Sequence, residues 1–317
     1  MEKWKNGGQT VIWNGDIPIP IGFEYKEGEK NEGYVIIDKR NGNEFVWVPV
    51  PDINEMVILN GVSTGNHAGK LYATDVGNIF DSGLTGQTYT AGTGLREPDI
   101  VIGTGEEYDA VQDNREIATG ISGISLTEYK QYLQDNFNAM VKSVNTYKGF
   151  YIGRYDTTGT TTTPTIKKGE PVIIEETWYS LYKMEREMYE GRVSVKSSMI
   201  WSCQWDHVMR IVETLGYDVK SSRTWGNYSN SLSPANVSGA GSLQAAGYSE
   251  FWKAYNIYDL AGNVQKYTME ASPTSRRMRR TGGVHESGSA WPASSRAETG
   301  PSAAAVNRGS RVQLYIK

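Results

Sequence analysis

The chain has 317 residues, a formal net charge of -4 and a single cysteine. This length allows one large domain or two ordinary ones, with a full hydrophobic core. The negative charge argues against a nucleic-acid partner, and one cysteine excludes an intrachain disulfide and a cysteine-based zinc site. No stretch is apolar enough to insert into a membrane, and the N-terminal residues lack the apolar core of a signal peptide.

The first part of the chain is expected to form a small sheet followed by an insert. Residues 1–20 are polar, contain Gly and Pro, and are interpreted as a lead-in segment or linker. Two short β-type runs follow, joined by an Asn-Gly turn, and they open a domain that spans 21–317. Residues 52–120 show no sustained period and are too long for an ordinary loop, so we expect an insert packed over the core.

Three helices are expected in the middle of the chain. A capping box at 125–128 and an apolar stripe behind it predict a helix over 125–144. A second helical pattern runs over 177–190. A third, over 197–214, carries a stripe of tryptophans, with one of its first two serines as the expected N-cap.

The last residues, SRVQLYIK, alternate polar and apolar and predict a closing β-strand over 310–316. The run GFYIGRYDT, which begins at Gly149, predicts a strand before it. We expect the helices over 125–144 and 197–214 to pack on a small, twisted, mostly antiparallel sheet. The closing strand should pair near the strands of residues 20–50.

The segment before the closing strand is unusual in composition. Between Gly282 and Arg308 the residues are mostly Ala, Ser and Gly, which offer too little apolar surface to build a core of their own. The surrounding domain must therefore hold this segment. It is either a flexible surface loop or a displayed surface whose side chains can be exchanged.

A basic run and an acidic run stand out by their charge. The acidic residues lack the spacing of a calcium loop and are interpreted as a solvated loop. The arginines could form a solvated face, or they could brace the long segment through carbonyls and acids. The acidic residues are Glu106, Glu107, Asp109 and Asp113, and the arginines are Arg276, Arg277, Arg279 and Arg280.

No pattern of residues predicts a catalytic or a metal site. The three histidines, His67, His207 and His285, have no His or Cys neighbour at ligand spacing. Cys203 lies between two tryptophans in the third helix and is interpreted as a buried small hydrophobe rather than a nucleophile. We therefore expect no cofactor and no bound metal.

Five stretches, taken together, resemble a C-type-lectin-fold protein of the formylglycine-generating-enzyme type. They appear in the family's order and cover about 20–317 apart from inserts. The stretches are GNEFVWVPV, GFYIGRYD, SSMIWSCQWDHVM, YDLAGNV and RRTGG…GSRV. The resemblance implies an α+β fold with small twisted, mostly antiparallel sheets, two or three helices, and long loops and inserts.

The departures from that family bear on function. The enzymes carry a cysteine pair just after R-x-GG, where this chain reads VHESGSAW, and related iron-dependent enzymes need a histidine-rich site. In the family, YDLAGNV continues with an acidic residue near bound calcium, whereas here Lys266 stands in that place. The resemblance therefore implies neither the oxidase chemistry nor the calcium for this chain.

The same fold with a hypervariable C-terminal segment occurs in variable proteins of diversity-generating retroelements, whose template is copied with errors at adenines. The closing segment resembles such a product over about 284–307. Glu286, Trp291 and Glu298 do not fit an Asn-codon origin and are interpreted as fixed or differently encoded. The residues expected to form the variable, ligand-binding face are Val284, His285, Ser287, Ala290, Trp291, Ser294, Ser295, Ala297, Thr299, Ala303, Ala304, Ala305, Val306 and Asn307.

This resemblance implies a non-enzymatic binding protein, displayed on a phage tail tip or a bacterial surface. Its ligand would be a protein or cell-surface molecule of a host or neighbouring cell. The alternatives are a divergent enzyme of the formylglycine-generating type and a structural phage or cell-surface domain without variable binding. The oligomeric state stays open. We expect the side chains of the variable face to be exposed and clustered, over an ordered backbone.

Overall fold

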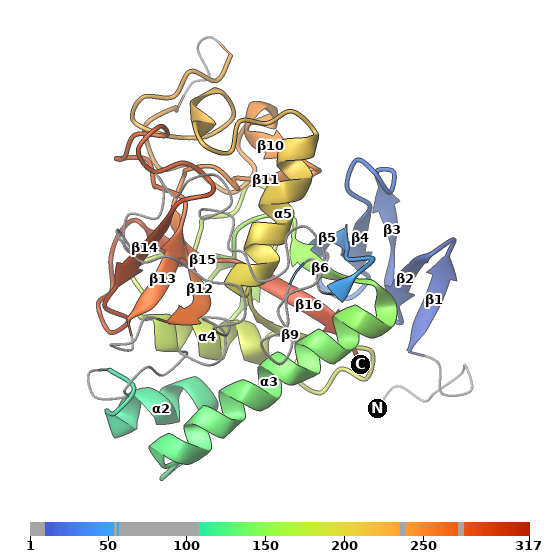
Figure 1. Ribbon diagram of the computed structural model, residues 1–317, viewed down its shortest axis with the longest axis vertical. Coiled ribbons are helices and arrows are strands. Elements are labelled where there is room, and N and C mark those ends of the chain that lie inside the picture. The colour runs from blue at the N-terminus through green and yellow to red at the C-terminus, as the bar shows by residue number, and fades with distance from the viewer. Residues whose placement is uncertain (1–9, 54–55, 57–107, 235–238, 272–275) are drawn as a thin grey trace.

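The computed structural model describes residues 10–53, 56, 108–234, 239–271 and 276–317, and they form a mixed α+β structure (Figure 1). The helices among them are α2 (Gln112–Thr119), α3 (Leu126–Tyr147), α4 (Trp178–Glu187) and α5 (Ser202–Thr214), with the short 3-10 helices η3 (Ser222–Thr224) and η4 (Glu250–Trp252). Among these residues, no helix combines the length and the apolar character needed to cross a membrane.

The largest sheet has six antiparallel strands in the order β3-β4-β5-β6-β16-β9. A second sheet has four strands in the order β14-β13-β12-β15, in which only the β12–β15 pair is parallel. The first sheet contains β3 (Phe23–Glu27), β4 (Val35–Asp38), β5 (Glu44–Pro49), β6 (Gly149–Gly153), β9 (Val195–Met199) and β16 (Val312–Ile316). The second contains β12 (Gln265–Ala271), β13 (Arg277–Arg280), β14 (Arg296–Thr299) and β15 (Arg308–Ser310).

Three small hairpins complete the described strands. They are β1 (Val11–Asn14) with β2 (Ile17–Pro20), β7 (Thr158–Gly159) with β8 (Pro164–Thr165), and β10 (Lys253–Ala254) with β11 (Ile257–Tyr258). The first hairpin falls within the segment expected as a lead-in. It packs on the large sheet, because the Tyr151 hydroxyl donates to Pro18 O and Val11, Ile17 and Ile19 join a buried cluster with strand residues.

The closing strand is confirmed over 312–316, whereas Ser310, at its predicted start, belongs to β15 of the four-stranded sheet. Strand β16 pairs with β6 and β9, and so shares one sheet with the strands of residues 20–50. The predicted Asn-Gly turn is also present, with Gly42 at a φ of 74° between β4 and β5. Strands β3 and β16 therefore lie in one sheet, whereas β1 and β2 form a two-stranded sheet of their own.

Helix α3 confirms the predicted capping box. The Ser125 hydroxyl accepts from the Glu128 amide, and the Glu128 carboxylate accepts from the Ser125 amide. The predicted apolar stripe is buried, and the helix lies against β6 and β16, where the Ser143 hydroxyl donates to Ile316 O. The helix continues to Tyr147, three residues beyond the predicted end.

The predicted start of the third helix is wrong. Ser197 and Ser198 belong to β9, where they pair with Leu314 and Gln313 of β16, and α5 begins only at Ser202. Pairing with the closing strand outweighs the local preference of serine for an N-cap. The second helix, α4, begins after the N-cap Thr177, close to the predicted start, but ends at Glu187 instead of at 190.

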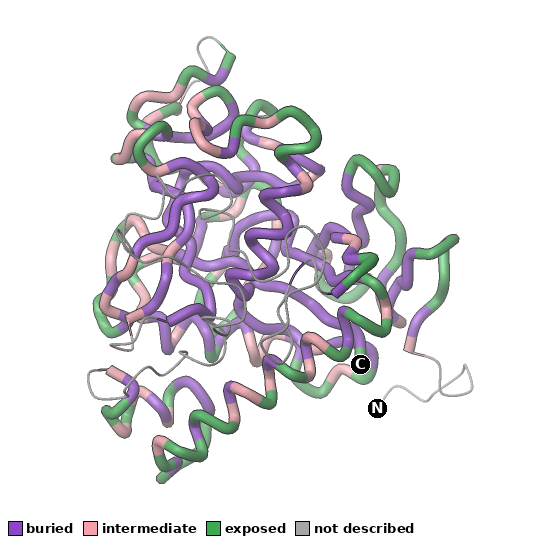
Figure 2. Tube along the Cα trace, viewed as in Figure 1, coloured by how far each residue is buried: buried purple, intermediate pink, exposed green. Residues whose placement is uncertain are grey.

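Buried residues concentrate in the centre of the molecule, whereas the loop tips are exposed (Figure 2). One buried cluster joins α3, α4 and α5 to the strands, and it includes Trp178, Trp201 and Trp205. Of the predicted insert over 52–120, the structure shows helix α2 at its end. Residues 57–107, with His67, Glu106 and Glu107, lie outside the described residues.

Candidate ligand-binding face

The closing segment leaves and re-enters the four-stranded sheet twice. Strand β13 pairs with β14, and β15 pairs with β12. The sheet therefore fixes both ends of two loops, over 281–295 and 300–307. We call these the first loop and the second loop.

The backbone of the first loop is bonded to neighbouring parts of the fold. The Val284 amide donates to Asn263 O over 3.1 Å, and the Gly288 amide donates to the Asn230 side chain over 2.9 Å. In return, Gly288 O accepts from the Ser222 amide over 3.0 Å. These bonds hold the loop in one conformation although it has no regular secondary structure.

Arg280 holds the C-terminal end of the first loop in place. Its fully buried guanidinium donates to Ser295 O over 2.8 Å and to Ser294 O over 2.9 Å, and it forms an ion pair of 2.7 Å with Asp206. Arg296 also pairs with Asp206, over 2.8 Å. Burial alone would raise the pKa of Asp206, but the two guanidiniums outweigh it and lower the pKa to about 2.

This network confirms one of the two interpretations of the basic run, in which its arginines brace the long segment. Arg277 is fully buried as well, and it pairs with Asp109 over 2.9 Å. The interpretation of Asp109 as part of a solvated loop is therefore wrong, whereas Asp113 is exposed as expected.

The exposed side chains of the closing segment fall in two short stretches. In the first loop, His285, Ser289 and Ala290 are exposed, and Ser287 and Trp291 are half-buried. In the second loop, the exposed residues are Ser302, Ala303, Ala304 and Val306, with Ala305 and Asn307 half-buried. Ser289 and Ser302 extend the face beyond the residues that the sequence indicated.

Five residues expected on the face are buried instead: Val284, Ser294, Ser295, Ala297 and Thr299. The expectation that they are exposed is wrong for a clear reason. Ser294 donates through its hydroxyl to Val219 O, and Ala297 and Thr299 stand opposite Arg279 and Arg277 in the β13–β14 ladder. Small side chains at these positions allow close packing, not display.

The two loops lie side by side. The Gln265 amide donates to Asn307 O over 2.8 Å, while the Gln265 side chain donates to the Glu286 carboxylate. A methyl group on Gly283 would lie 3.7 Å from the Asn307 side chain. The first and second loops therefore meet at Gly283, Glu286 and Asn307.

At the junction of the loops lie side chains that the sequence did not assign to the face. The Arg279 guanidinium lies over the Trp291 ring, 5.2 Å from its centroid, and 3.7 Å from the Glu286 carboxylate. Arg308, at the start of β15, is half-buried beside them. Strand alternation within the basic run could have placed Arg277 and Arg279 on one side of the sheet.

The other residues singled out by their chemistry are structural. Cys203 is buried, and His207 contacts Pro49 O through Nε2 over 2.8 Å. Lys266 is fully buried and donates to Gly262 O over 2.6 Å, and burial lowers its pKa to about 8. Because the Lys266 ammonium already occupies this carbonyl in the YDLAGNV turn, the residues there do not fit a calcium ion.

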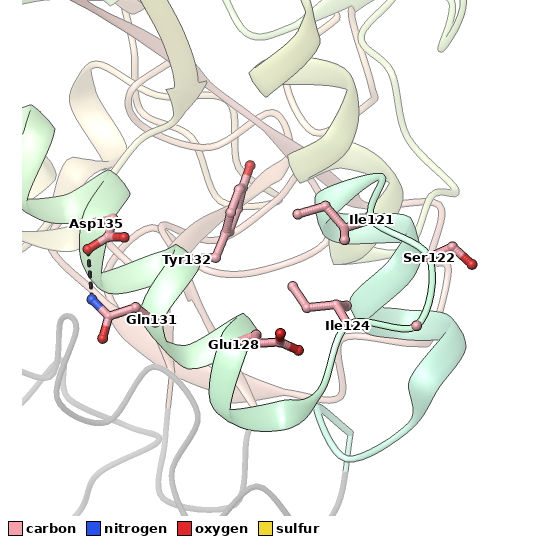
Figure 3. A pocket seen from close by; sticks show the side chains of 8 residues that line it. Ile121, Ser122, Ile124, Glu128, Gln131, Tyr132 and Asp135 are labelled. Atoms are coloured by element: carbon pink, nitrogen blue, oxygen red, sulfur yellow. Dashed lines mark hydrogen bonds between the residues drawn. The ribbon is translucent and has the colours of Figure 1, made fainter.

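Within the described ranges, no group of three or more His, Cys, Asp or Glu side chains is arranged to hold a metal ion. An open pocket of about 380 Å³ lies elsewhere, between the turn after α2 and the first turns of α3. Ile121, Ile124 and Tyr132 form its apolar lining, and Gln131 donates to Asp135 at its edge (Figure 3). None of the residues expected on the face lines this pocket.

Comparisons with known proteins find similarity among solved structures. No protein-family model matches the sequence, and no curated protein sequence does. Among solved structures, Treponema denticola variable protein 1 is similar, with 13% sequence identity and a TM-score of 0.37, over 53% of this chain and 85% of that chain. A TM-score this low does not establish a shared fold, so we base the proposed function on the geometry of the closing segment.

Proposed function

We propose that this protein binds a ligand through a variable face formed by the two loops of the closing segment. The observation that carries the proposal is a fixed backbone beneath exposed, mostly small side chains. Hydrogen bonds with Asn230, Asn263 and Gln265 hold the loops, whereas the side chains of Ala290, Ala303 and Val306 are exposed. Such a surface can change its side chains without losing its shape.

The free-energy cost of substitutions separates exposed positions, which can vary, from buried positions, which cannot. A change at an exposed position usually alters the free energy of unfolding by less than about 0.5 kcal/mol. A larger side chain at a buried position forces the packing apart and costs about 1–3 kcal/mol. The variable positions are therefore His285, Ser287, Ser289, Ala290, Ser302, Ala303, Ala304, Ala305, Val306 and Asn307.

In this proposal the chain has a C-type lectin scaffold and is the target protein of a diversity-generating retroelement. Its ligand is a protein or cell-surface molecule of a host or neighbouring cell, and binding does not involve catalysis. The protein is displayed on a phage tail tip or a bacterial surface. The resemblance in sequence and the backbone-held face support these statements.

The DNA beside the gene tests the proposal. We expect a near-copy of the codons for 284–307, close to a reverse-transcriptase gene, with differences confined to adenines of the copy. The differing codons should encode the exposed residues of the face. The codons for Val284, Ser294 and Ala297 should be unchanged, because their side chains are buried.

Two results would contradict the proposal. The absence of any such copy would favour a structural domain without variable binding. Differences spread equally over exposed and buried codons would show that the face derived from the structure is not the diversified surface. Sequencing the gene from many clones of one population provides a second readout, with variation expected at the same exposed codons.

A further inference from the structure

The floor of the face is formed by side chains from three strands of the four-stranded sheet. Tyr267 of β12 stands opposite Arg279 of β13, and Gln265 of β12 stands opposite Arg308 of β15. Paired residues share one side of a sheet, as do residues two apart on a strand. Arg279 and Arg308 therefore project to the same side, between the first and second loops.

The Arg279 guanidinium is held in position but is short of acceptors. The Trp291 ring stacks on it, and only 16% of its side chain is exposed. Its nearest carboxylate, Glu286, is 3.7 Å away, which is too long for a hydrogen bond. Both oxygens of Glu286 already accept from Gln265 and from the Gly283 amide, and Nε of Arg279 has no partner.

Arg308 is in a similar position. Its Nε is buried without a partner, its Nη1 donates to Ala303 O over 3.5 Å, and its guanidinium also contacts the Tyr267 side chain. Burial lowers the pKa of Arg279; Glu286 opposes this, and the positive charge of Arg308 adds to it. Arg308 thus adds a second positive charge beside Arg279, and an added anion would relieve their repulsion.

We propose that Arg279 and Arg308 bind a carboxylate of an acidic segment on the partner protein, as a fixed anchor within the variable face. This inference rests on the proposed function and specifies the chemistry of the partner. A guanidinium presents paired donors that match a planar carboxylate, and Trp291 restricts the approach to the plane of the Arg279 group. Trp and Arg are also the residues that most often dominate binding interfaces.

The anchor explains how one face can vary and still bind. The exposed loop residues around it are small, so a partner can reach the half-buried arginines between them. Glu286 holds Gly283 and Gln265 in place, and so preserves the floor while the side chains around it change. Changes in the exposed loop residues around the two arginines then select among partners that share an acidic group.

Calorimetric titration of the full chain with acetyl-Glu-Glu-Glu-Glu-amide tests the anchor. We expect saturable binding, and weaker or no binding of the matching Gln peptide. Arg279→Gln and Arg308→Gln should each weaken binding of the Glu peptide at least about tenfold, because each removes one charged, paired contact. Arg279→Lys keeps the charge but loses the paired donors, and should weaken binding as well.

Arg40→Gln is the matched control, because Arg40 is an exposed arginine in the β4–β5 turn, outside the face. It should bind the Glu peptide as the unaltered chain does. Melting curves of all variants check the fold. The proposal would be overturned if Arg40→Gln weakened binding of the Glu peptide as much as the other variants do, or if the Arg279 and Arg308 variants bound it unchanged. Binding of inorganic phosphate as tight as that of the Glu peptide would also overturn it.

The peptide-binding test of the anchor and the DNA test of the proposed function can fail independently of each other. If the adenine-differing copy is found but the Glu peptide does not bind, the variable face stands and the carboxylate anchor fails. If the peptide binds through Arg279 and Arg308 but no copy exists, the anchor stands as a fixed binding site and the variable face fails.

Discussion

Asp109 and Arg277 form a fully buried ion pair of 2.9 Å, although 168 residues separate them in the chain. The Tyr179 hydroxyl donates to the same carboxylate over 2.7 Å, and the Trp178 ring lies 3.9 Å from the guanidinium carbon. The pair fastens the residues before α2 to the start of β13. It therefore anchors the strand from which the first loop departs.

Removing this carboxylate should destabilise the whole fold. Asp109→Ala leaves the Arg277 charge buried without its partner, and we expect a loss of about 3–5 kcal/mol in the free energy of unfolding. Asp113→Ala, an exposed acid on α2, is the control and should change stability by less than about 0.5 kcal/mol. Urea denaturation measures both, and equal effects would show that the pair contributes nothing special.

The brace under the first loop makes a second prediction. Arg280→Met removes the donors to Ser294 O and Ser295 O and unpairs part of Asp206. We expect a loss of about 3 kcal/mol and faster amide hydrogen exchange across 281–295. If the amide hydrogens of the first loop exchange at the same rate in the variant as in the unaltered chain, Arg280 does not hold this loop.

Buried acids should make stability depend on pH. Burial raises the pKa of Glu185 to about 7 from its ordinary 4.5; hydrogen bonds from Thr157 and Ser310 and the charge of Arg311 oppose the shift, and Asp156 reinforces it. Burial likewise raises the pKa of Asp259 to about 6. The folded state then holds protons that the unfolded state has released.

Stability should therefore fall as the pH rises from about 4.5 to about 7, by up to about 3 kcal/mol for Glu185. Lys266 is buried near Asp259. Because its pKa is about 8, its effect on the free energy of unfolding falls at higher pH. Glu185→Gln resembles the protonated acid and should remove most of this slope. Glu190→Gln, a change at an exposed position of the chain, should leave the slope unchanged. Asp259 keeps a smaller slope below about pH 6, so an undiminished slope in the Glu185 variant would contradict the assignment.

Cys203 should be inert in the folded protein. The residue is 2% exposed and lies in the first turn of α5, where its neighbours are buried as well. A thiol reagent should label the denatured chain rapidly and the native chain only at the rate of unfolding. Rapid labelling of the native protein would point to a reactive cysteine.

Local patterns in the sequence predict part of the fold. The capping box of α3 and the alternation of the closing strand involve residues close in the chain, and both predictions are confirmed. The serines of β9 fail as N-caps because their pairing with β16 joins residues more than a hundred positions apart. Contacts of that kind leave no mark on local residue patterns.

For the candidate face, too, the sequence does not reveal contacts between residues that are far apart in the chain. Composition marks the closing segment as unusual, but Ser289 and Ser294 look alike in the sequence. Their exposure differs because Ser294 donates to Val219 O, in a part of the chain 75 residues away. The role of Arg279 likewise depends on Trp291 and Glu286, which contact it from within the first loop.

The central claim is that the closing segment displays exchangeable side chains on a fixed backbone. Two variants with the same three types of substitution test it. In the first, all three changes are at exposed positions, and in the second, all three are at buried ones. The exposed set is Ser289→Tyr, Ala290→Asp and Ala303→Tyr, and the buried set is Ser294→Tyr, Ala293→Asp and Ala297→Tyr.

The decisive measurement is the melting temperature of these two variants beside the unaltered chain. We predict that the exposed set stays within about 3 °C, because each change costs less than about 0.5 kcal/mol. The buried set should lose more than about 10 °C or fail to fold, since it overfills close packing and buries an unpaired charge. A comparable loss in the exposed set would contradict the account, because the loops would then be part of the core and not a displayed face.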